Sequence, residues 1–240
     1  MVWHLVTHLG NNLKKLKMMK TENSIQKTAK FAGWAYFLII VTALLSITLG
    51  SFMPMDDVSV AETIENIKEN QSLYRINYVY EILMYSGVIL LSVALFQILK
   101  GINKAFALTA LLFRFGEAIM GMIMVIGSII ILYLVNSDFS TESNQKTITI
   151  IFELKDALMS MLMVFIGLGS IINFYLFYKS NFIPRWLSVF GITAFSFVLI
   201  ESLVLHVKPM HAWMFPGMLA IVFEIVVGLW LMIKGIKTNS

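Results

Sequence analysis

Arg114 and Glu117 lie three residues apart inside a run of about thirty mostly apolar residues. Side chains at this spacing share one face of an α-helix, so an arginine and a carboxylate can form an ion pair there. Ionisable side chains at membrane depth are costly, usually face the protein interior, and mark ligand, ion or proton sites. This pair is therefore the first candidate for a functional site in the sequence.

Four more acidic residues occupy similar apolar stretches elsewhere in the chain: Glu81, Asp156, Glu201 and Glu224. Counted at about 1.5 Å per residue from the ends of those stretches, all the charges are expected in one layer, from the bilayer midplane toward its outer half. Small residues recur on the same helical faces, as Gly121 does with Glu117. Such faces pack against other helices, which predicts that the charges meet in a shared interior.

A single arginine cannot hold five carboxylates in such an interior. We predict that Glu117 and Glu224 pair with Arg114. The remaining acids are then the titratable or ligand-facing groups: Glu81, Asp156 and Glu201. The charge is balanced if some carboxyl groups are neutral, if a cation binds, or if water enters from outside.

Three kinds of function are compatible with this pattern. The first is a binding or transport-like module, with an outward-opening, carboxylate-lined cavity that takes a small cation or a polar small molecule. The second is a structural or assembly subunit whose intramembrane charges pair completely. The third is an intramembrane enzyme, although the sequence has no HExxH, P-loop or Gly-x-Ser-x-Gly motif, and no catalytic residue is assigned.

No cofactor and no metal are predicted. The sequence has no cysteine, so it has no thiolate ligand or thiol nucleophile. His206 and His211 could join Glu201 in a metal site at the outer surface. Their five-residue spacing around Pro209 is, however, not a recognised ligand pattern.

The elements that must position these charges are membrane-spanning helices. Hydrophobic residues make up 58% of the chain and charged residues only 13%, whereas soluble domains carry about 25% charged residues. We therefore predict an all-α, polytopic integral membrane protein with a bundle of six transmembrane helices. The expected spans are about 31–52, 76–98, 105–135, 148–178, 186–205 and 215–233. Ser59 and Glu62 have the spacing of a capping box, which predicts a further short helix on the outer face.

The distribution of cations predicts that both termini are cytoplasmic. Twelve lysines and arginines fall in the proposed inner segments and five in the outer ones, with Lys155 counted outside because its side chain can snorkel. This distribution explains the net charge of +4 without a nucleic-acid partner. Trp34 and Tyr36, near the start of the first span, are expected to anchor it at the membrane interface.

Three parts of the chain are expected. Residues 1–30 form a basic cytoplasmic segment, either an amphipathic helix on the inner leaflet or, in part, an extension before a natural start at Met18 or Met19. Residues 31–235 form the six-span membrane domain, and residues 236–240 form a short cytoplasmic tail.

Four segments, in order, resemble one known family. They are KTAKFAGWAY at 27–36, FRFGEA at 113–118, NFIPRWLSVFG at 181–191 and GLWLMIKG at 228–235. From about Lys27 to Gly235 the chain resembles the bacterial membrane family called domain of unknown function 4386. The resemblance implies a multi-pass protein of the bacterial cytoplasmic membrane. Its expected partner is the lipid bilayer. It implies no activity, substrate, site residue or oligomeric state.

Overall fold

The computed structural model describes residues 2–49, 59–137, 141–207 and 214–237. Within these residues the secondary structure is helical throughout. The helices are α1 (Val2–Leu49), α2 (Val60–Glu69), α3 (Gln71–Leu99), α4 (Lys104–Val135), α5 (Thr141–Ser180), α6 (Arg185–Val207) and α7 (Met214–Ile233). All except α2 contain a segment long and apolar enough to cross a bilayer. The prediction of an all-α membrane protein with six spans is confirmed.

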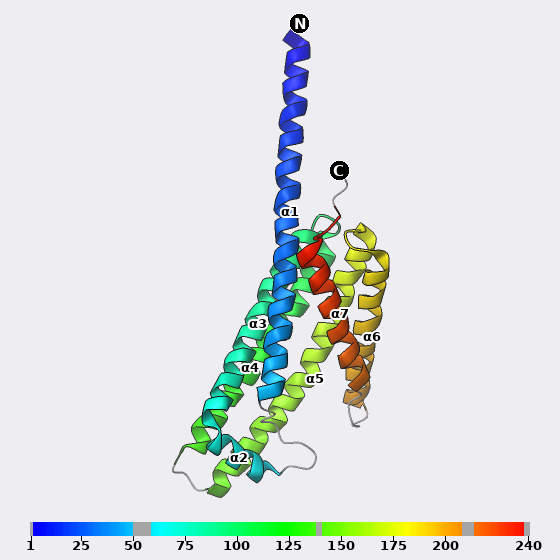
Figure 1. The fold of residues 1–240 in the computed structure, drawn as a ribbon. Coiled ribbons are helices and arrows are strands. Elements are labelled where there is room, and N and C mark those ends of the chain that lie inside the picture. Colours follow the sequence, from blue (N-terminus) through cyan, green and yellow to red (C-terminus); the bar gives the residue numbers. More distant parts are fainter. Residues whose placement is uncertain (1, 50–58, 138–140, 208–213, 238–240) are drawn as a thin grey trace.

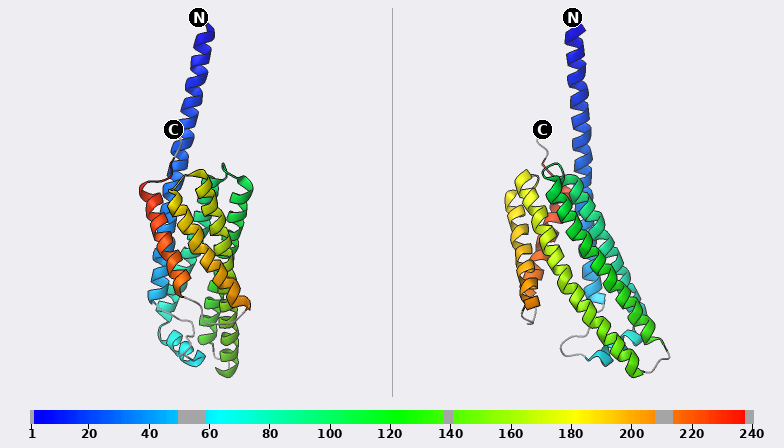
Figure 2. Two further views of the ribbon diagram at one scale, coloured as in Figure 1. Left: turned by 90° about the vertical axis from the view of Figure 1, so that its right-hand side faces the viewer. Right: turned by 180° about the vertical axis from the view of Figure 1, so that it is seen from behind.

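The six long helices form one bundle (Figure 1), and their contacts close it into a ring. In chain order each of them packs against the next, from α1 and α3 round to α7, and α7 returns to α1. Among the described residues, the backbone of α4 touches neither α1 nor α7, so only side chains cross the interior between these helices. Both chain ends lie at one end of the bundle, called the terminal end below (Figure 2). The opposite end is called the α2 end.

Three helices project beyond the others at the α2 end (Figure 1). At about 1.5 Å per residue, α5 is about 60 Å long and α7 only about 30 Å, which is roughly the thickness of a bilayer core. The extra turns of α3, α4 and α5 exceed what one crossing of a bilayer core requires, and α2 packs across them. Together they bury a small core of their own, made of Ile67, Tyr74, Ile131, Leu132, Ile148 and Phe152.

The predicted capping box at the start of α2 is present. The backbone N–H of Glu62 donates to Ser59 Oγ at 3.2 Å, and the backbone N–H of Ser59 donates to Glu62 Oε2 at 2.8 Å. These bonds satisfy donors that a helix N-terminus otherwise leaves unpaired. Ile67, fully buried, then fixes α2 onto the ends of the longer helices.

Acid should weaken the start of α2. The hydrogen bonds from Ser59 lower the pKa of Glu62 below its ordinary value. The cap therefore contributes stability above the ordinary glutamate pKa of about 4.3 and loses it as the pH falls through the lower pKa of the folded state. We expect hydrogen-exchange protection factors in α2 to fall over this acid range. Glu62→Gln should remove the pH dependence, whereas Glu65→Gln, an exposed site on the same helix, should leave it intact.

The last turns of the chain fasten the terminal end of the bundle. The Gln26 side chain bonds both backbone groups of Ile236, and one of these bonds, from Ile236 N–H to Gln26 Oε1, measures 3.2 Å. The backbone N–H of Lys237 donates to Phe182 O at 2.8 Å. Gly235 makes this turn possible, because its φ of +67° lies in the left-handed region that favours glycine.

The basic segment before the first span is helical from residue 2 and continuous with the rest of α1. It points away from the bundle along the axis of the span (Figures 1 and 2). Its location on the inner leaflet stays a prediction.

Candidate functional site

The centre of the bundle contains a buried ion pair on α4. Arg114 Nη1 and Glu117 Oε2 lie 2.9 Å apart, and each residue is 3% exposed. The two atoms are not aligned for a hydrogen bond, so the contact is mainly electrostatic. Gly169 on α5 makes room for the arginine, because a Cβ there would approach Arg114 Cγ to 3.1 Å. Arg114 and Glu117, at i, i+3 spacing, therefore form a pair inside the ring.

Two residues from other helices join this pair electrostatically. Glu224 on α7 and Tyr36 on α1 both lie within range of the Arg114 charge. Because the backbone of α4 touches neither α1 nor α7, these polar side chains connect helices across the interior. The expectation that Tyr36 anchors the protein at the interface is wrong, since Tyr36 is 3% exposed, whereas Trp34 is 58% exposed.

A short approach between α1 and α7 explains why Tyr36 is buried. A Cβ added at Gly228 would come within 3.0 Å of Tyr36 Cβ. Gly33 lies one helical turn before Tyr36, on the same face of α1, and also meets the α7 backbone. Small residues that let two membrane helices approach closely thus turn the tyrosine inward. This spacing was visible in the sequence and could have identified the residue.

A second buried cation lies nearer the α2 end. Lys155 is 6% exposed, and its Nζ donates to Ser128 Oγ on α4 at 2.7 Å. Its charge interacts with Glu81 on α3 and with the neighbouring Asp156. The assignment of Lys155 to the outer surface is therefore wrong. The burial of Lys155 could have been predicted from its spacing, because Lys155 lies on the same buried face of α5 as Phe152.

The acids lie at different depths instead of in one layer. Measured at about 1.5 Å per residue from the helix ends at the terminal end, Glu224 lies at about 13 Å and Arg114 at about 15 Å. Glu201 and Glu81 lie at about 24 and 27 Å. Asp156 lies at about 36 Å, beyond the roughly 30 Å of a bilayer core. The expectation of a single layer counts from the ends of the apolar stretches and therefore leaves out the turns that α5 adds at the α2 end.

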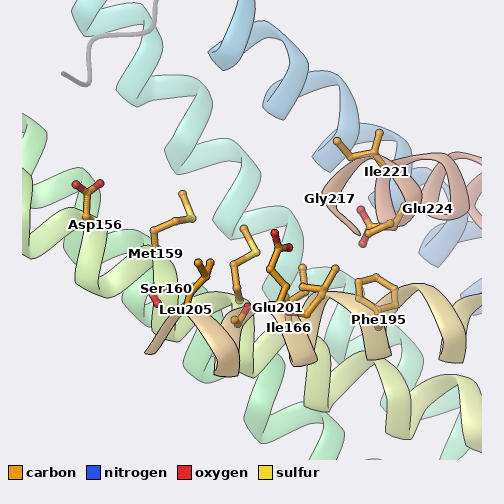
Figure 3. Close-up of a pocket in the computed structure, with 14 residues that line it drawn as sticks. Asp156, Met159, Ser160, Ile166, Phe195, Glu201, Leu205, Gly217, Ile221 and Glu224 are labelled. Carbon is orange, nitrogen blue, oxygen red and sulfur yellow. Dashed lines mark hydrogen bonds between the residues drawn. The ribbon is translucent and has the colours of Figure 1, made fainter. Parts of the chain in front are cut away.

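A cavity of about 460 Å³ lies between α5, α6 and α7 (Figure 3). Its polar lining consists of three carboxylates and two hydroxyls, from Asp156, Glu201, Glu224, Ser160 and Ser202. The remaining lining is largely apolar and includes Met159, Met163, Phe195 and Val198. The carboxylates of Glu201 and Glu224 extend from α6 and α7 toward the cavity, and Asp156 lies at the opposite end from Glu224 (Figure 3). The cavity therefore runs from the depth of Arg114 toward the α2 end.

The six predicted residues thus occupy three places. Asp156, Glu201 and Glu224 line the cavity. Arg114 and Glu117 form the buried pair behind Glu224, outside the cavity lining. Glu81 is also absent from that lining and belongs with Lys155 between α3, α4 and α5.

The possible metal site of His206, His211 and Glu201 lies only partly within the described residues. His206 Nδ1 lies 2.7 Å from the carbonyl oxygen of Ser202, which can only accept, so Nδ1 carries a proton. The same ring contacts Ser160 Oγ at 3.2 Å. His211 lies outside the described residues. Within them no group of three possible metal ligands is found.

Comparison with known proteins gives a family and no further relative. No curated protein and no solved structure matches the chain. One family model matches residues 31–235, a region that contains most of the first candidate span, the other five whole and every predicted site residue. The protein is therefore a multi-pass membrane protein that belongs to the family described as domain of unknown function (DUF4386).

Proposed function

We propose that this protein is a binding or transport-like module whose ligand occupies the cavity between α5, α6 and α7. The observation that carries the proposal is the cavity itself, which has the volume of a small-molecule site and three carboxylates in a mainly apolar wall. Arg114 is the fixed cation of the adjoining cluster, and Glu117 holds it in place. Glu201, Glu224 and Asp156 are the ligand-facing acids.

We also propose the orientation. Both termini are in the cytoplasm of a bacterial cell, and the α2 end faces outward. The distribution of lysines and arginines supports this orientation. Because Lys155 is buried, it no longer counts among the outer cations, but the inner segments still contain more cations than the outer ones. The cavity then opens outward, because it runs from Glu224 near the bilayer centre to Asp156 at the α2 end.

Two single-cysteine variants test the cavity and the orientation together. The chain has no cysteine, so each introduced thiol is the only one present. Gly217 lines the cavity, and Gly101 lies in the turn between α3 and α4 at the terminal end. A Cβ at either position meets nothing within 4 Å, so the two variants are matched in steric cost.

A membrane-impermeant maleimide applied to intact cells should label Gly217→Cys and leave Gly101→Cys unlabelled. Both should react after permeabilisation. The opposite pattern would reverse the orientation. No reaction at position 217 under either condition would mean that water does not reach the cavity, and the binding function would then fail.

A structural or assembly subunit is the second candidate. The observation in its favour is the Arg114–Glu117 pair, which is buried, mutually neutralised and separate from the cavity lining. In that case the intramembrane charges serve only to fix helix packing. The maleimide experiment separates the two candidates, because a purely structural subunit needs no water-accessible position 217.

A further inference from the structure

The ionisable side chains in the described lining of the cavity are all acidic. Among the described residues that line it are three carboxylates and no basic side chain. A site of this kind repels anions. A neutral polar ligand can donate hydrogen bonds to the carboxylates but leaves their charge unbalanced. Charge complementarity therefore selects a cationic ligand.

The three carboxylates are too far apart in depth to surround one inorganic ion. Glu224, Glu201 and Asp156 lie at about 13, 24 and 36 Å along their helices. A bare metal cation needs several oxygens at about 2–2.6 Å simultaneously. The arrangement suits a single positive charge carried by a bulky apolar body better than it suits a metal ion.

Glu224 is the carboxylate best placed to hold that positive group. It extends into the cavity at its inner end (Figure 3). Arg114 lies within electrostatic range of Glu224, but its ion pair at 2.9 Å is with Glu117. Within the described residues, Glu224 forms no hydrogen bond and no ion pair of its own. A carboxylate at this depth whose neighbouring cation is already paired with another acid costs free energy, which a cationic ligand would recover.

The apolar wall fits the rest of such a ligand. Met159, Met163 and Phe195 face the same cavity. Methionine side chains adapt to irregular apolar shapes, and an aromatic ring attracts cations to its face. A volume of about 460 Å³ is within the usual range for drug-sized molecules.

We infer that the cavity takes a bulky, largely apolar organic cation, with its positive charge next to Glu224 and its apolar surface against Met159, Met163 and Phe195. This inference rests on the proposed binding function and specifies its ligand class. Asp156 at the outer end adds a negative field that favours entry of the cation.

Tetraphenylphosphonium and tetraphenylborate form a suitable probe pair, because they have nearly the same shape and opposite charge. Binding is measured by equilibrium dialysis with the full chain in detergent micelles, and binding to protein-free micelles is subtracted. We expect the phosphonium to bind and the borate not to bind. Glu224→Gln should weaken phosphonium binding about tenfold or more, because it removes the charge and keeps the shape. Glu153→Gln removes an exposed acid of α5 that does not line the cavity, and it should change the affinity by less than about threefold.

Equal binding of both probes would overturn the inference, as would unchanged phosphonium affinity in a folded Glu224→Gln variant. If that variant does not fold, Gly217→Phe provides the second test. Position 217 lines the cavity and has open space around it, so the phenylalanine side chain can occupy the cavity. This variant should abolish phosphonium binding. Retained binding would show that the probe binds elsewhere. Absence of phosphonium binding while Gly217→Cys is labelled from outside would reject this ligand class and leave the cavity function standing. Absence of labelling would reject both.

Discussion

Arg114→Gln is expected to destabilise the bundle by about 3–5 kcal/mol, the usual cost of removing one partner from a buried ion pair. Arg114 and Glu117 are each 3% exposed, so water cannot replace the lost cation. The substitution leaves Glu117 buried beside Glu224 with no positive charge between them. It also removes the arginine stem that packs against Gly169, where a Cβ would find Arg114 Cγ at 3.1 Å.

The free energy of unfolding can be measured by SDS titration in mixed micelles, followed by far-ultraviolet circular dichroism. Lys146→Gln is the matched control, because the Lys146–Glu142 pair has the same 2.9 Å separation but is largely exposed, and its loss should cost less than about 1 kcal/mol. The double variant Arg114→Gln, Glu117→Gln should regain part of the loss, since it also removes the unpaired charge. Equal losses in Arg114→Gln and Lys146→Gln would refute the buried pair as a stabilising element.

Local patterns were sufficient to predict the elements of this fold. Spans of apolar length, a capping box at Ser59 and an i, i+3 charge pair at Arg114 each depend on residues close together in the sequence. In a bilayer such local patterns determine much of the secondary structure, because an apolar segment that spans the membrane must be helical to satisfy its own backbone hydrogen bonds. The six spans and the short α2 helix follow from such local rules.

The arrangement of the charges depended on distances that the sequence does not contain. Lys155 was assigned to the surface because a lysine near a span end can snorkel, yet α5 continues past it and α4 supplies Ser128 as a partner. The expected depth of Asp156 depends on the same span end, and an apolar stretch does not show how far its helix continues at the α2 end. Glu81 then falls beside Lys155 instead of in the cavity. Depth and partner both come from how neighbouring helices are staggered, which is a property of the assembled ring.

The ring closes where α1 meets α7, and Gly33 is the residue on which that contact depends most directly. A Cβ at position 33 would lie 2.4 Å from the backbone nitrogen of Met232 and 2.8 Å from the carbonyl oxygen of Gly228. Backbone atoms cannot rotate away as a side chain can, so the two helices must separate. Gly33→Ala should therefore cost about 3 kcal/mol, at the upper end of the usual range for overpacking.

Gly101→Ala is the matched control for this substitution, because a Cβ there meets nothing within 4 Å, and its effect should stay within about 0.5 kcal/mol. Separation of α1 from α7 also moves Tyr36 and Glu224, which lie one to three turns from the contact on those same helices. In detergent, Gly33→Ala should therefore melt at a lower temperature than Gly101→Ala, and whatever remains folded should bind tetraphenylphosphonium less tightly. Identical melting of the two variants would show that α1 and α7 do not approach closely at Gly33, and the closed ring that places Glu224 at the inner end of the cavity would have to be abandoned.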